Sequence, residues 1–168
     1  DFNDFTTTGT ATRAGILDLG SAGGSNGRAD GDAFTINISD VVGGLGRNVT
    51  VTLVANDGNF GSIGADNIEV VRPTSDDTCA DRLRAAINGT SDGAYDATKI
   101  KWGANITGGT TGLQGVTASD NADASLLDLT AAAPGSPGNL TALANTQGAI
   151  VQNASLAGGV GVDGAVQA

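Results

Sequence analysis

Few side chains in this sequence could take part in chemistry. The 168 residues contain no histidine and a single cysteine, Cys79. Without an imidazole, neither a serine-type triad nor an ordinary zinc site can be assembled, and Cys79 has no base to activate it. Lys99 and Lys101 lie on a predicted strand, where we expect solvated side chains. The sequence therefore predicts no catalytic residue and a protein that is not an enzyme.

Aspartate is the abundant charged side chain, because 17 of the 18 acidic residues are Asp and only Glu69 is Glu. Two carboxylates can serve a glycosidase, but many Asp on turns produce close pairs without any function. Residues 30–32, 57–59 and 120–123 place oxygen ligands on loops, as calcium prefers, yet none completes the twelve-residue loop with a bidentate Glu. Turn formation is therefore favoured over calcium, and we predict no metal ligand and no cofactor.

Composition and charge narrow the class of protein. The formal net charge is −10, and the eight Lys and Arg residues form no stripe that could follow a phosphate backbone, so no nucleic-acid partner is expected. No apolar run is long enough to span a membrane. The 27 glycines and the preference for Asp over Glu are typical of short strands joined by tight turns.

The hydrophobic pattern predicts the elements that must position any site. Alternation of apolar and polar residues predicts a hairpin of strands at 32–39 and 49–54, with a further strand at 67–71. An acidic first turn, an apolar stripe at helical spacing and a closing Asn88-Gly89 predict one amphipathic helix over 76–88. Further strands are predicted at 99–102, with Trp102 a large core residue, in a hairpin of 112–119 with 125–131, and at 140–144 and 149–151. The expected fold is mainly β, a sandwich or distorted barrel with the helix packed on a sheet.

Several motifs occur in a characteristic order along the chain. G-D-A-F-T-I-N precedes N-V-T-V-T-L-V-A, an I-E-V strand and the helix T-C-A-D-R-L-R-A-A-I-N; V-T-A-S, L-L-D-L-T-A-A-A-P-G-S-P-G-N and S-L-A-G-G follow. This order resembles a module of tailed-phage structural proteins: capsid decoration or fibre proteins, tail proteins, and inserts in tail sheaths and flagellins. The second strand has T-L-V where the family has an aromatic F-x-F. Residues 134–138 are expected to form a rigid turn, since Pro fixes φ and Gly permits positive φ.

The resemblance implies a virion protein on the outer capsid surface that stabilises the capsid by binding between subunits of the major capsid protein. Alternatives are a tail or fibre component, a secreted bacterial surface or flagellin-type module and, disfavoured by the scarcity of aromatic residues, a carbohydrate-binding module. We expect a homo-oligomer, with a trimer favoured, and no membrane partner. The predicted organisation is a flexible N-terminal arm (1–30), a β-rich domain (31–159) and a C-terminal tail (160–168). The predicted partner-binding residues are Phe2, Phe5, Ile16, Leu17, Val160, Val162 and Val166.

Overall fold

The structure is a computed structural model. It describes residues 11–18, 30–38, 46–55, 60, 63–73, 76–106, 112–122, 126–134, 142–147 and 151–153. Among these residues, no helix is long and apolar enough to cross a membrane.

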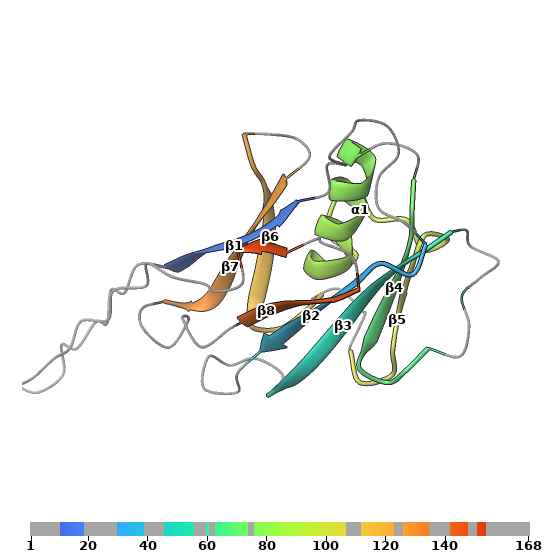
Figure 1. The fold of residues 1–168 in the computed structure, drawn as a ribbon, viewed down its shortest axis with the longest axis horizontal. Helices are drawn as coiled ribbons and strands as arrows, with labels where there is room; N and C mark the ends of the chain where they lie inside the picture. The colour runs from blue at the N-terminus through green and yellow to red at the C-terminus, as the bar shows by residue number, and fades with distance from the viewer. Residues whose placement is uncertain are drawn as a thin grey trace, which may run out of the picture.

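The described strands form two sheets (Figure 1). The five-stranded sheet has the order β5-β4-β3-β2-β8 and consists of Ile100–Trp102, Asn67–Val71, Arg47–Val54, Ala33–Ile38 and Ala142–Gln147. The four-stranded sheet has the order β6-β7-β1-β9 and consists of Val116–Asp120, Leu126–Pro134, Ala11–Asp18 and Val151–Asn153. Every pairing is antiparallel except that of β3 with β4, which is parallel. The prediction of a mainly β fold with a helix on a sheet is confirmed, and neither sheet closes into a barrel.

The predicted hairpin of β2 and β3 is confirmed, with Ile36 opposite Val49. Because side chains alternate across a strand, one face of this pair is apolar and the other polar. The inward side chains of both strands are buried: Phe34, Ile36, Ile38, Val49, Val51 and Leu53. They form a single hydrophobic core with side chains of the helix and of the four-stranded sheet.

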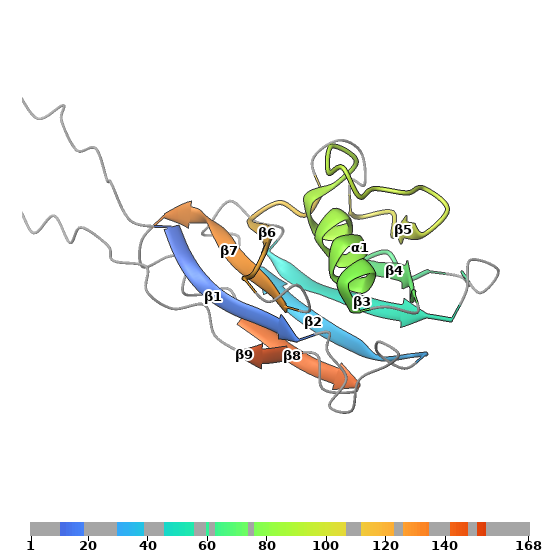
Figure 2. The same ribbon diagram turned by 90° about the horizontal axis from the view of Figure 1, so that it is seen from above.

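Helix α1 spans Asp76–Asn88, as predicted. Its apolar stripe is buried, including Leu83 and Ile87, and it contacts β6 most extensively and β4, β5 and β7 less. Figure 2 shows α1 lying across the five-stranded sheet, beside β6 and β7. The helix ends at Gly89, which has a positive φ of 91°. Its N–H donates to the Ala85 carbonyl at 2.8 Å.

The predicted flexible N-terminal arm, residues 1–30, included Ala11–Asp18, which instead form strand β1 of the four-stranded sheet. This strand lies between β7 and β9, so its backbone pairs with a neighbour on both sides. The sequence pattern of this segment has few apolar anchors, but the backbone groups of an inner strand can pair with both neighbours whatever its side chains are. The β-rich domain therefore includes residues well before residue 31.

The hairpin predicted from 112–119 and 125–131 is confirmed as β6 and β7. Strand β6 begins later than predicted, because Gly112 and Gly115 both have positive φ, 58° and 95°, which a strand does not accept. Strand β7 continues to Pro134, which pairs with Ala11 of β1. The rest of the predicted rigid turn, 135–138, lies outside the described residues.

Candidate functional site

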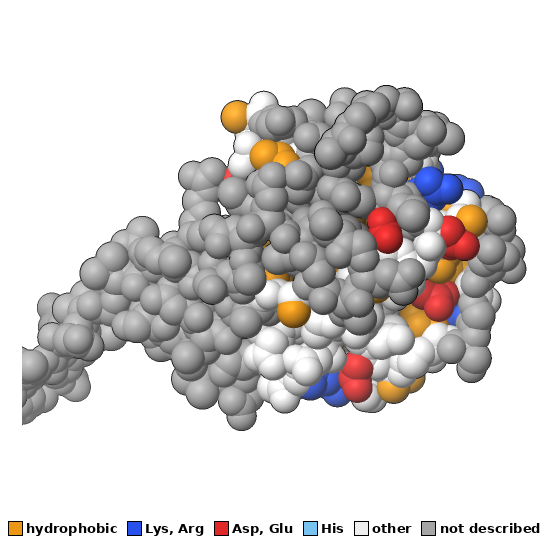
Figure 3. All heavy atoms as spheres, in the orientation of Figure 1, with side chains coloured by type: hydrophobic (Ala, Val, Ile, Leu, Met, Phe, Trp, Pro, Cys, Tyr) orange, Lys and Arg blue, Asp and Glu red, His pale blue; other side chains and the backbone are white. Residues whose placement is uncertain are grey.

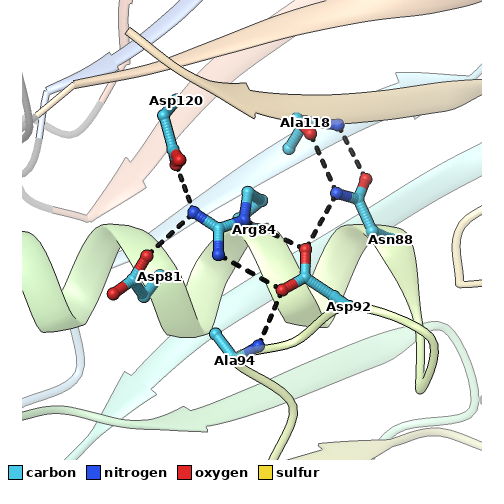
Figure 4. Close-up of polar contacts among 7 residues, drawn as sticks. All are labelled: Asp81, Arg84, Asn88, Asp92, Ala94, Ala118 and Asp120. Atoms are coloured by element: carbon cyan, nitrogen blue, oxygen red, sulfur yellow. Dashed lines mark hydrogen bonds and ion pairs between the residues drawn. The ribbon is translucent and has the colours of Figure 1, made fainter.

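Arg84 is the centre of a polar cluster that joins α1, the segment after it and β6 (Figure 4). Its side chain is 18% exposed. Nε and Nη2 donate to the two carboxylate oxygens of Asp92 at 3.0 and 3.3 Å, a bidentate pairing. Nη1 donates to Asp81 at 2.8 Å and also to Asp120 on β6. One guanidinium therefore contacts three carboxylates from three different parts of the chain.

Asp92 is the most enclosed of these carboxylates, with 8% of its side chain exposed. Besides the Arg84 bonds it accepts the Ala94 N–H at 2.9 Å and the Asn88 Nδ2 at 3.2 Å. Burial raises the pKa of Asp92, but the hydrogen bonds from Arg84, Ala94 and Asn88 outweigh it and hold the pKa below its ordinary value. The hydrogen bond to Asp92 raises the pKa of Arg84, an effect that burial opposes. Both groups are thus held in their charged forms.

Asn88 binds the backbone of β6 through both ends of its side-chain amide. Its Oδ1 accepts the Ala118 N–H at 2.9 Å and its Nδ2 donates to the Ala118 carbonyl at 2.8 Å. Because β6 is at the edge of its sheet, none of the described strands pairs with these backbone groups on that side. The side chain takes the place of a paired residue there. We call Arg84, Asn88, Asp92 and Ala118 the helix clamp.

Two further contacts fix the helix to the five-stranded sheet. Arg82 Nη1 donates to the carbonyl of Val71, at the end of β4, at 2.6 Å. Trp102 of β5 donates its indole N–H to the Ala86 carbonyl at 3.0 Å. Its ring stacks on Tyr95, with centroids 5.4 Å apart. Trp102, predicted as a large core residue, is partly buried and packs against the core.

The Asp-rich loops that were weighed as calcium sites, and for which turn formation was favoured, make turn and side-chain contacts where they are described. Asp30 Oδ1 accepts the Ala55 N–H at 2.8 Å, Asp120 pairs with Arg84, and Asn121 Nδ2 donates to the buried Asp128 at 2.8 Å. Residues 57–59 lie outside the described part of the chain. Within the described ranges, no group of three or more Cys, Asp or Glu is placed to hold a metal ion.

Two of the seven predicted partner-binding residues lie among those that the structure describes. Ile16 and Leu17 lie within β1, opposite Asp128 and Leu127 of β7. The other five lie outside the described residues: Phe2, Phe5, Val160, Val162 and Val166.

The helix clamp was not predicted from the sequence, although the sequence carries a signal for it. Asp81, Arg84 and Asn88 are spaced three and four residues apart, which places them on one face of a helix. Asp92 follows after four more residues, beyond the helix end. A polar stripe that continues past a helix terminus indicates a neighbouring element, but it does not identify β6 as that element.

The fold and the cluster define a mainly β protein of two sheets, with a helix fastened to both by polar side chains. Searches of family models, curated proteins and solved structures find no match to this chain.

Proposed function

We propose that this chain is a structural virion protein that decorates a tailed-phage capsid and stabilises it by binding between subunits of the major capsid protein. The observation that carries the proposal is the helix clamp: its polar groups are used to hold elements of the domain together. A rigid domain of this kind suits a protein whose task is to fill and brace a lattice. The ordered motifs from G-D-A-F-T-I-N to S-L-A-G-G add support through their resemblance to tailed-phage structural modules.

In this proposal the docking segments lie at the two ends of the chain. On the face seen in Figure 3, the described acidic side chains are separated by neutral and apolar atoms and form no single continuous patch. We propose docking through apolar anchors at the chain ends instead of through one charged surface. We assign this role to Phe2 and Phe5, with Ile16 and Leu17 in the strand that ties the arm to the domain. At the other end we assign it to the alternating valines, Val160, Val162 and Val166.

The stabilisation follows from mass action. A protein that binds the assembled capsid and not the free subunit favours assembly by about 2.7 kcal/mol per site when its free concentration is about 100 times Kd. The capsid should therefore melt at a higher temperature when decorated.

Light scattering of the purified protein, alone and with capsids of the virus that encodes it, tests the proposal. We expect a monomer or trimer that saturates the capsids and raises their melting temperature. Self-assembly into tubes or rings would instead support a tail or surface-filament protein, and indifference to capsids would overturn the proposal.

Deletion of residues 1–9 tests the docking segment separately. This deletion leaves β1 intact, because the strand begins at Ala11. We expect an unchanged melting temperature of the isolated protein and a loss of capsid binding. Asp96→Asn, a change at an exposed turn, serves as the control that should retain binding. Full binding by the truncated chain would show that the arm is not the docking segment.

A further inference from the structure

We propose that Asn88–Gly89 is a gated deamidation site, protected while α1 is clamped to β6 and reactive when the clamp opens. The site lies at the C-terminal end of α1. The inference rests on the helix clamp alone and is independent of the proposed virion function.

The chemistry requires only the chain and water. The Gly89 backbone nitrogen loses its proton and attacks Cγ of Asn88, the new N–C bond closes a succinimide ring, and the side-chain nitrogen leaves as ammonia. Water then opens the ring to give aspartate or isoaspartate. Glycine in the second position favours the attack, because it has no side chain to crowd the nitrogen and its backbone rotates freely.

The folded structure blocks both reacting groups. The Gly89 N–H donates to the Ala85 carbonyl at 2.8 Å, so the attacking nitrogen is engaged within the helix end. The Asn88 amide is held on Ala118 at 2.8 and 2.9 Å. Attack requires this side chain to turn back onto its own peptide, which breaks both bonds to β6.

The segment before β6 encloses the same peptide from another side. The Leu113 N–H donates to the Ile87 carbonyl at 2.7 Å. Gly112 lies so close that a Cβ at this position would be 2.2 Å from that carbonyl oxygen. Gly89 itself is buried. The succinimide can therefore form only after the helix end separates from residues 112–118.

Deamidation would also prevent the clamp from closing again. The product carboxylate has lost the donor that binds the Ala118 carbonyl. It would also stand where Nδ2 now lies, 3.2 Å from Asp92 Oδ2. Two negative charges at this distance repel, and one of them is largely buried. A transient opening thus becomes a permanent loss of helix docking.

The full-length protein is incubated at mildly alkaline pH, folded and in urea, and Asn88 deamidation is followed by peptide mass spectrometry. The chain supplies an internal standard, since Asn26–Gly27 is a second Asn-Gly pair. In urea we expect similar rates at the two sites. In the folded protein we expect Asn88 to react at least about tenfold more slowly than it does in urea. Equal Asn88 rates in the two conditions would overturn the proposal.

Arg84→Gln tests whether the clamp is the gate, with Arg47→Gln as the matched control. Each change removes an arginine that pairs with an aspartate, Arg47 with Asp66 at 3.1 Å and Arg84 within the clamp. Under conditions where both variants are folded, Arg84→Gln should accelerate Asn88 deamidation several-fold and Arg47→Gln should leave it unchanged. Equal acceleration by both would contradict gating by the clamp. If Arg84→Gln fails to fold, the comparison of folded and urea-treated wild type still tests whether the folded structure protects Asn88, and equal rates there would overturn the proposal.

Discussion

The side-chain amide of Asn88 pairs with both backbone groups of Ala118, thirty residues further along the chain. In a sheet, a residue of the neighbouring strand makes this pair of hydrogen bonds; here a side chain at the end of a helix makes them. Edge strands expose unpaired backbone groups that invite association with other chains. Asn88 therefore does two things: it fastens α1 to the four-stranded sheet and covers part of the β6 edge.

Asn88→Asp should destabilise the protein more than Asn88→Ala does. Alanine loses the hydrogen bonds of the amide, with an expected cost of about 2 kcal/mol. Aspartate loses the donor to Ala118 and adds a negative charge beside the largely buried Asp92, so we expect about 3–4 kcal/mol. Urea unfolding near neutral pH measures both variants. An aspartate variant as stable as the alanine variant would show that repulsion from Asp92 is unimportant.

Acid should weaken the fold through Asp92. Its pKa in the folded state lies below the ordinary value of 3.8, so the charged carboxylate contributes stability that is present above that value. This contribution is lost as the pH falls below 3.8 towards the folded pKa. The difference in unfolding free energy between wild type and Asp92→Asn should therefore be constant near neutral pH and shrink towards about pH 3.

Asp96 also has a lowered pKa, because the N–H and hydroxyl of Thr98 donate to it. The contribution of Asp96 to the free energy of unfolding has the same sign as that of Asp92. It is present in both wild type and Asp92→Asn, so it cancels in the difference between them. A difference that does not change with pH would contradict the role of the Asp92 carboxylate.

Gly112→Ala should be strongly destabilising and Gly93→Ala should not. Gly112 has φ 58°, and a Cβ there would meet the Ile87 carbonyl oxygen at 2.2 Å. Backbone strain and this clash together should cost more than about 3 kcal/mol. A Cβ at Gly93 meets nothing within 4 Å. Gly93→Ala should therefore change the free energy of unfolding by no more than about 0.5 kcal/mol. Thermal unfolding distinguishes the two, and similar melting temperatures would argue against the close approach of residue 112 to the helix end.

Trp102→Phe isolates the hydrogen bond of the indole from its stacking. Phenylalanine keeps a ring that can face Tyr95 but has no donor for the Ala86 carbonyl, 3.0 Å from Nε1 in the wild type. We expect a loss of about 1–2 kcal/mol from the missing hydrogen bond and the smaller ring. Tyr95→Phe keeps the stack and the indole bond, so it should be close to wild type in urea unfolding. A larger loss for Tyr95→Phe would assign the stability to the phenol hydroxyl instead.

The local elements whose signals are short-range could be predicted from the sequence alone. The alternation of Phe34, Ile36 and Ile38 with polar residues could form only a half-buried strand, and its pairing with the next run followed from the turn between them. The bounds of α1 followed from the apolar stripe and from Asn88-Gly89. These features depend on side-chain period and backbone freedom within a few residues, so they can be read before the fold is known.

The contacts between distant segments could be learned only from the folded structure. Residues 11–18 have too weak an apolar pattern to indicate a strand, and they form one because β7 and β9 pair with both of their edges. Asn88 appeared in the sequence as the end of a helix, and its partner Ala118 offers only backbone groups, which every residue possesses. A residue that is bound only through its backbone cannot be recognised from its side chain, and therefore not from the sequence. The helix clamp could therefore be found only where the chain places α1 against β6.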